Sequence, residues 1–315
     1  SGTVKFTSNA SVSGNQGYFY PYNPGDDQAI TLLVESGDVL PGWQETWNAV
    51  GDFRTTLAVG VAQNGMVPGV YFSSTGSDVH YTAMGDTDVT VEMGSLGNSI
   101  VRDKDSSDGT EKLIIGGNYD GGTGTLDLTM VGQAAATHQR INASVEVLAG
   151  SKLNLDADDH MIMMDNHLGP ADFTVGGAGE VHVLDAANEV QVRAGTLAAD
   201  TVVESGGTLL VMGSGSVTAD VTVQAGGTAG VSNDYRGDQE WLVEGNVSGS
   251  GTVLVDSTHA SRTATMKMGA TGSLGSDVHV SVGPNADFGS DQSFFDMNSQ
   301  GNVTIGKLSG RGTVY

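Results

Sequence analysis

Carboxylates are the first residues in this chain that could do chemistry, and they are densest between residues 156 and 165. A pair of carboxyl groups could hydrolyse a glycosidic bond, and carboxylates with imidazoles could hold a metal ion. A solvated acidic loop explains the same composition and is the simplest interpretation, while the metal site and the catalytic pair stay open as alternatives. The cluster consists of Asp156, Asp158, Asp159 and Asp165, with His160 and His167.

A second acidic segment resembles a calcium-binding loop in outline. Asp103, Asp105 and Asp108 precede Gly109. Calcium takes several oxygen ligands, and glycine permits the sharp turn that such a loop needs. The spacing is one residue longer than the start of an EF-hand loop and no apolar helices flank it, so a polar surface turn competes with this interpretation. The three aspartates remain a weak calcium candidate, and we expect no other cofactor.

Arg236, Gly237 and Asp238 form the tripeptide that integrins bind. Their polar neighbours Asn233 and Asp234 indicate an exposed loop. Because three common residues also coincide by chance, an incidental sequence is the competing interpretation. We keep the tripeptide as a candidate receptor contact.

The familiar catalytic motifs are missing. The sequence lacks the G-D-S-G turn and the G-x-S-x-G elbow of serine hydrolases, and it lacks a phosphate-binding loop. The G-H-G and R-I-K units of β-helical pectin hydrolases are absent, and thirteen basic residues are few for a lyase that must neutralise a uronate. No histidine has zinc spacing with a third ligand. We therefore predict no catalysis, with a glycan hydrolase or lyase as the enzymatic alternative.

Composition argues against several partners. Thirteen Lys and Arg against 37 Asp and Glu give a net charge of -24, which opposes binding to a nucleic-acid backbone or an anionic membrane. The chain has no cysteine, which excludes disulfides and thiol chemistry. No apolar run approaches the roughly 18 residues of a membrane-spanning helix. We predict neither nucleic-acid binding nor direct membrane insertion.

The elements that must position these residues are short β-strands separated by glycine. Runs such as 221–223 alternate apolar and polar residues, which is the pattern of a half-buried strand. The segment 203–209 recurs at 223–229, displaced by 20 residues. Three short strands and three turns in about 20 residues make one coil of a parallel β-helix, with equivalent positions stacked about 4.8 Å apart. A second unit, built on G-x-G, occurs at 175–181, 247–253 and 308–314.

These repeats predict an all-β fold, a right-handed parallel β-helix (β-solenoid) that forms one continuous structural unit. Residues 111–315 should form regular coils, and residues 1–110 an N-terminal cap with the first irregular coils. Eleven of the 19 aromatic residues lie before residue 82, where they could plug the open end of the bore. An aromatic shelf that binds carbohydrate or peptide is the alternative.

The same pattern predicts which residues face the bore and where loops are inserted. Side chains of Val203, Leu209, Val223 and Val253 should point inward, and Thr208 should point outward. Stacked Thr, Ser and Asn should line the outside of the coils. Inserted loops are expected at 156–170, 233–239 and 287–300, and the run 161–164 is expected to fill the core rather than to bind copper.

The repeat units resemble autotransporter passenger domains, the secreted parts of type V secretion proteins in the style of pertactin and the AIDA-type adhesins. The resemblance is carried by V-x-x-G-G-T-L at 203–209 and by S-G-x-G-T-V at 248–253 and 309–314. It covers roughly residues 115–315, and it concerns repeat style, which other β-solenoids share in part.

The resemblance implies a place at the bacterial cell surface, on the extracellular side of the outer membrane, or secretion. It also implies a covalently linked C-terminal outer-membrane β-barrel, so we expect the chain to be truncated at its C-terminus. The expected role is adhesion, self-association between cells, or contact with a host surface protein or glycan. The alternative is a β-helical protein that binds or cleaves polysaccharide, which includes phage tailspike-like proteins.

Overall fold

The computed structural model describes strands within residues 2–103 by their backbone, and most of residues 112–315 with side chains. The fully described ranges are 112–117, 125–130, 139–157, 161–166, 172–185, 189–233, 237–259, 261–284, 292–298 and 303–315.

In the part of the chain that the structure describes, thirty-three strands form four sheets, in which neighbouring strands are parallel. Sheet A contains, in order, β1 (Gly2–Phe6), β2 (Ile30–Val34), β4 (Thr55–Val59), β7 (Val79–Ala83), β10 (Lys112–Asn118), β13 (Ser144–Val147), β16 (Thr174–Gly177), β19 (Thr196–Leu197) and β22 (Ser216–Val217). Sheet C contains β5 (Met66–Val67), β8 (Val89–Met93), β11 (Leu126–Val131), β14 (Lys152–Asp156), β17 (Glu180–Val183), β20 (Asp200–Val203), β23 (Val221–Val223), β26 (Asn246–Gly249) and β29 (Ser273–Leu274).

The other two sheets complete the coils. Sheet B contains β3 (Trp47–Ala49), β6 (Val70–Phe72), β9 (Ser99–Asp103), β12 (Gln139–Asn142), β15 (Ile162–Met164), β18 (Val190–Val192), β21 (Thr208–Val211), β24 (Thr228–Asn233), β27 (Thr252–Ser257), β30 (His279–Val282) and β32 (Lys307–Gly310). Sheet D contains β25 (Gln239–Val243), β28 (Ala264–Met268), β31 (Ser293–Asp296) and β33 (Thr313–Val314).

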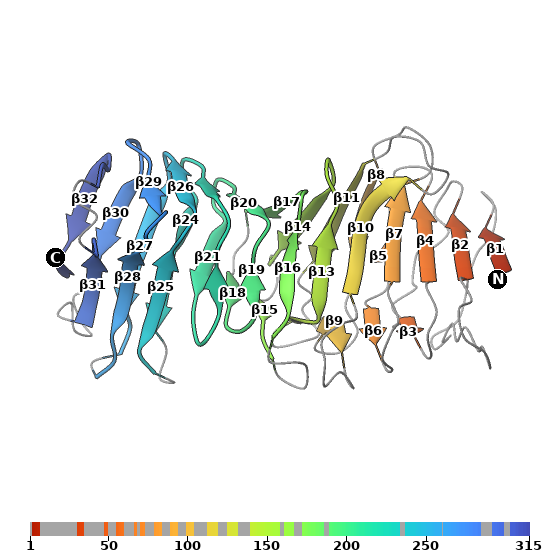
Figure 1. The fold of residues 1–315 in the computed structure, drawn as a ribbon, viewed down its shortest axis with the longest axis horizontal. Helices are drawn as coiled ribbons and strands as arrows, with labels where there is room; N and C mark the ends of the chain where they lie inside the picture. Colours follow the sequence, from red (N-terminus) through yellow and green to blue (C-terminus); the bar gives the residue numbers. More distant parts are fainter. Residues whose placement is uncertain are drawn as a thin grey trace.

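From β10 to β22 the chain visits sheets A, C and B in turn, and each strand pairs with the strand one coil away. Beyond β22, sheet D occupies the place of sheet A in the stack: its first strand, β25, contacts β22, the last strand of sheet A. The coils stack along the long axis of the molecule, with the two termini at opposite ends (Figure 1). The described residues contain no α-helix. The all-β parallel β-helix predicted from the repeats is therefore confirmed.

The strand register confirms the 20-residue repeat. Thr208 pairs with Thr228 and Val203 pairs with Val223, so equivalent residues of the two G-G-T units lie directly above one another. Val203, Val223 and Val253 are fully buried and Leu209 is 1% exposed, whereas the outward-facing Thr208 is only half-buried. The predicted bore residues therefore form the core, which continues through the coils from Leu113 to Phe295.

The G-x-G unit makes the same corner in three different places. It joins β16 to β17, β26 to β27 and β32 to β33, which are corners between different pairs of sheets. Its first glycine has a positive φ each time: 122° at Gly177, 96° at Gly249 and 106° at Gly310. A Cβ at Gly249 would collide with the carbonyl oxygen of Val223 in the coil below. Glycine is required there because L-residues avoid this φ and because the two backbones approach closely.

Two of the three predicted loops were wrong in their middle parts. The segment 156–170 contains β15, whose three residues are all buried, and the segment 287–300 contains β31 with the buried Phe295. In both places a short apolar run contributes a strand to the stack even though polar residues surround it. The burial of β15 agrees with the prediction that the run 161–164 fills the core. Segment 233–239 does lie between the end of β24 and the start of β25.

The predicted N-terminal aromatic cap lies outside the residues whose side chains are described. The backbone does show that strands within residues 2–103 join sheets A, B and C. The coils before and after residue 110 therefore share the same parallel sheets.

Candidate functional site: the outer face of sheet A

A column of hydroxyl side chains runs across the outer face of sheet A. Because successive side chains of a strand point to opposite faces, the residues beside the buried valines and leucines point outward. Strand pairing aligns Thr174 with Thr196 and Thr196 with Ser216, and the pairing of β13 with β16 sets Ser144 beside Thr174. We call these four residues, one from each of four successive coils, the hydroxyl ladder.

Hydrogen bonds connect members of the hydroxyl ladder. The backbone N–H of Thr174 donates to Ser144 Oγ at 3.3 Å, and Thr196 Oγ1 lies 3.0 Å from Ser216 Oγ. Thr174 is exposed and the other three residues are half-buried. The ladder is therefore ordered by the coil stack and still reaches solvent.

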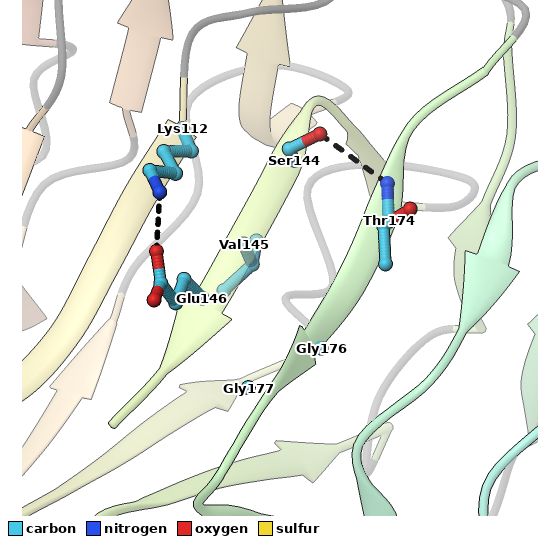
Figure 2. A pocket seen from close by; sticks show the side chains of 7 residues that line it. All are labelled: Lys112, Ser144, Val145, Glu146, Thr174, Gly176 and Gly177. Atoms are coloured by element: carbon cyan, nitrogen blue, oxygen red, sulfur yellow. Dashed lines mark hydrogen bonds and ion pairs between the residues drawn. The ribbon is translucent and has the colours of Figure 1, made fainter.

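A shallow hollow of about 280 Å³ lies beside the ladder at the β10–β13–β16 end of the face. Figure 2 shows the ion pair between Lys112 and Glu146 on one side of it and Thr174 on the other. The hollow exists because Gly176, which pairs with Glu146, places no side chain on the sheet surface. A Cβ at Gly176 would lie 3.2 Å from Thr174 Cγ2. The hollow is lined by Lys112, Ser144, Val145, Glu146, Thr174, Gly176 and Gly177.

Three carboxylates stand in one column on the outer face of sheet C, next to Lys152, which pairs with Glu180 from the preceding coil. Glu180 pairs with Asp200, and the pairing of β20 with β23 sets Asp200 beside Asp220. All three carboxylates are exposed, and we call them the acidic column. Asp220 Oδ1 accepts a hydrogen bond from the backbone N–H of Asn246 at 2.7 Å, which links it to the next coil.

His182 lies beside the acidic column and contacts two carboxylates. Its Nδ1 lies 2.8 Å from Glu204 Oε1, and its Nε2 lies 3.0 Å from Glu180 Oε2. The two carboxylates therefore lie at opposite ends of the imidazole ring. A single metal ion could not bind His182, Glu180 and Glu204 together in this arrangement. In the part of the chain that the structure describes, no group of three or more His, Cys, Asp or Glu could hold a metal ion.

The structure places only part of the acidic segment 156–165. Asp156 ends β14 in sheet C, whereas Asp165 follows β15 in sheet B, so these two aspartates belong to different sheets. Asp165 Oδ2 lies 3.5 Å from Arg140 Nε, and both side chains are largely buried. Asp158, Asp159, His160 and His167 lie outside the described residues.

Of the other predicted site residues, only some lie in the part of the chain that the structure describes. Asp238 is exposed, and its Oδ1 accepts a hydrogen bond from the backbone N–H of Thr263 at 2.8 Å. The carboxylate of the tripeptide thus has a structural contact with the next coil. Arg236, Asp105 and Asp108 lie outside the described residues, and Asp103 ends β9 with only its backbone described. Receptor contact and calcium binding at these residues stay predictions.

Sequence reasoning predicted outward ladders of Ser and Thr, but it missed the acidic column and the contacts of His182. The signal for the acidic column was available, because Glu180, Asp200 and Asp220 are each 20 residues apart, the same spacing as the repeat. The contact of His182 with Glu204 spans 22 residues and does not follow from that spacing.

Comparison with known proteins found no relative: no family model, no curated protein and no solved structure matches this chain. Within the described ranges there is also no helix long and apolar enough to cross a membrane.

Proposed function

We propose that this chain is a surface-displayed or secreted passenger of the autotransporter type, which acts in adhesion, self-association or host contact and has no catalytic activity. The observation that carries this proposal is the hydroxyl ladder on the outer face of sheet A. The role at the bacterial cell surface and the linked outer-membrane barrel come from the resemblance of the repeats.

A ladder of hydroxyl groups suits contact rather than catalysis. Each hydroxyl can donate one hydrogen bond and accept two, so the ladder can bind many polar partners. The strands fix the hydroxyls at a regular spacing of about 4.8 Å, so the backbone that carries them loses little conformational entropy on binding. Weak single contacts of this kind become strong when many copies act together on one cell.

The carboxylates on sheet C also fit a role without catalysis. A glycosidase needs one carboxylic acid and one carboxylate in different environments on either side of the scissile bond. Glu180, Asp200 and Asp220 are all exposed and stand side by side in a single column, which does not place an acid and a base on opposite sides of a substrate. His182 contacts both Glu180 and Glu204, which engages them in a cross-coil contact.

Binding or cleavage of a polysaccharide is the second candidate function. The hollow at Gly176 favours binding, because its polar rim and glycine floor could accept a sugar hydroxyl. The acidic column favours cleavage, since it brings several carboxylates onto one face. The partners proposed for the chain are therefore a host surface protein, a glycan or a second copy, with Arg236, Gly237 and Asp238 as a further candidate contact.

The test displays the chain on bacteria that do not aggregate and follows both settling of the cells and binding of the cells to host surfaces. The net charge of -24 opposes contact between copies, so settling should increase as salt screens the repulsion. The purified chain is assayed in parallel for cleavage of acidic and neutral glycans, with a Glu180→Gln, Asp200→Asn double variant of the acidic column as control. Cleavage that this double variant abolishes would establish the second candidate and overturn the first.

A further inference from the structure

We propose that His279, Lys307 and Ser309, on the outer face of sheet B, form a binding site for a sulfate-type oxyanion, carried by a sugar or free in solution. We call these three residues the oxyanion site. The inference rests on the proposed contact function and specifies the chemistry of its partner. Strand pairing sets Lys307 of β32 beside His279 of β30, and Ser309 beside Ser281. Because Val280 between them is fully buried, His279 and Ser281 point to the outer face.

Three hydrogen-bond donors lie together at this site. His279 Nε2 lies 2.7 Å from Ser309 Oγ, whereas Ser309 Oγ lies 3.5 Å from Ser281 Oγ. The second distance allows only a weak hydrogen bond. When Nε2–H donates to Ser309 Oγ, the serine hydroxyl can therefore turn its own proton toward a ligand. Lys307 adds an ammonium group with three donors. Lys307 is exposed and the other two members are half-buried, so a ligand can reach all three.

The charges around His279 favour an anion. Burial lowers the pKa of the His279 imidazole, and the ammonium of Lys307 lowers that pKa further. On the other side of the ring, in β27, the outward residues are the uncharged Thr252 and Leu254. Asp277, which is exposed, precedes β30. A bound oxyanion would offset the charge of Lys307 and would accept hydrogen bonds from the site.

The last coil is also distinct in charge from the rest of the chain. Residues 297–315 contain Lys307 and Arg311 and no Asp or Glu, although the whole chain has a net charge of -24. His182 shows the contrast, because both of its ring nitrogens contact carboxylates, whereas Nε2 of His279 contacts a hydroxyl. The overall charge still repels a long polyanion. The site therefore suits a ligand that carries few negative charges.

A column of threonines leads to the oxyanion site. Thr208 pairs with Thr228, Thr228 with Thr252, and Thr252 with His279. The three threonines are half-buried, so their hydroxyls remain accessible. Each can donate and accept hydrogen bonds, as the hydroxyls of a sugar can. The sugar that carries a sulfate at His279 therefore has polar partners along this threonine column, which favours a sulfated sugar over a free anion.

NMR titration of the histidines in the purified full chain tests the site. The chain has seven histidines, and the His279→Gln variant identifies the signal of His279. Sodium sulfate should raise the pKa of His279 relative to sodium chloride at equal ionic strength, because an adjacent anion favours the imidazolium. By linkage, sulfate should bind more tightly at about pH 5.5 than at about pH 7.5, and His279→Gln should remove this difference. Equal pKa values of His279 in the two salts would overturn the inference.

A pair of lysine variants separates a local site from a response to net charge. Lys307→Gln should weaken sulfate binding about fivefold, which corresponds to about 1 kcal/mol for an exposed ionic contact. Lys267→Gln is the matched control, since Lys267 points outward from β28 of sheet D and pairs with Asp296. It should bind sulfate like the unmodified chain. Circular dichroism establishes that both variants are folded. Equal weakening in the two variants would overturn the site.

Two disaccharides distinguish the sources of the oxyanion. A sulfated disaccharide should bind more tightly than inorganic sulfate, and the same disaccharide without its sulfate ester should leave the signal of His279 unchanged. Equal affinity for the sulfated sugar and inorganic sulfate would support the oxyanion site and overturn the role of the threonine column. An equal effect of both disaccharides on His279 would overturn the oxyanion site.

Cells that display the chain separate this inference from the proposed function. If these cells bind host surfaces while sulfate leaves the pKa of His279 unchanged, the inference is overturned and the contact function survives. If sulfate binds at His279 but the cells bind neither host surfaces nor one another, the oxyanion site is supported and the proposed contact function fails.

Discussion

Glu204 Oε1 lies 2.8 Å from Nδ1 of His182, so one imidazole ring connects β17 to the residue that follows β20 in the next coil. The same ring contacts Glu180 within its own strand through Nε2. The side chain of His182 is 13% exposed, whereas that of Glu180 is 51% exposed. The side chain of Glu204 is 28% exposed, so the contact of His182 with Glu204 is better shielded from solvent than its contact with Glu180.

This arrangement predicts that His182→Ala lowers the stability of the stack. The variant removes two hydrogen bonds, each of which contributes about 0.5–1.5 kcal/mol. Urea unfolding followed by circular dichroism should show a loss of about 1–2 kcal/mol. Thr222→Ala is the control, because its hydroxyl makes only one exposed contact, 3.3 Å from Ser248 Oγ. An equal loss in both variants would contradict a special role for His182.

The inward and outward positions of β23 should differ sharply in their tolerance of charge. Val223 is fully buried, whereas its neighbour Thr222 is exposed on the opposite face. Val223→Asp buries an unpaired carboxylate and should cost about 3–5 kcal/mol, or prevent folding. Thr222→Asp should cost less than about 1 kcal/mol. Thermal melts of the two variants check the register, and similar losses would show that it is wrong.

The corner glycine Gly249 should not tolerate a side chain. Its φ of 96° and its close approach to the backbone of Val223 both oppose a Cβ. Gly249→Ala should destabilise the chain by about 1–3 kcal/mol. Gly237→Ala is the matched control: the nearest atom to an added Cβ there is Gln239 Nε2, at 3.8 Å. A melting temperature that falls as far for Gly237→Ala as for Gly249→Ala would refute this explanation of the corner.

The stability of the last coils should depend on pH through His279. Burial lowers the pKa of the His279 imidazole, and the nearby ammonium of Lys307 lowers that pKa further. The unfolded state therefore binds a proton at a higher pH than the folded state, so the contribution of His279 is complete above about pH 6.5 and is lost progressively below it.

His279→Gln removes this titration while keeping a side chain that can hydrogen-bond to Ser309 Oγ, which lies 2.7 Å from Nε2 in the structure. Unfolding free energies of both proteins between pH 7.5 and pH 5 provide the measurement. The unmodified chain should lose more stability on acidification than His279→Gln. Parallel pH profiles would show that His279 does not contribute.

Much of the fold could be predicted because the signal was local and repeated. The displacement between residues 203 and 223 set both the coil length and the inward positions, and strand pairing confirms it. Polar outer ladders followed from the same alternation. Which outward residues stack on one another could not be predicted, because the coils differ in length. Ser144 and Thr174 are neighbours although they lie 30 residues apart, whereas Thr196 and Ser216 are neighbours at a separation of 20. The sequence therefore shows which residues share a column on an outer face only when the length of every inserted segment between coils is known.

The strand β15 illustrates the same difficulty. Three apolar residues between aspartates resemble a loop insertion in sequence, because nothing local distinguishes a three-residue strand from a turn. Its partners in β12 and β18 supply the pairing that makes it a strand. The contacts of His182 were missed for a similar reason, since they join two coils through side chains whose spacing carries no period.

The G-x-G corner bears on how long the coil stack can be. Because the same unit turns the chain at three corners between different sheets, it depends on the backbone of the coil below and not on one particular sheet. A whole coil bounded by such corners can be duplicated or deleted while each neighbour still receives an equivalent surface on which to stack. The distance between the two ends of the rod can therefore change in steps of about 4.8 Å.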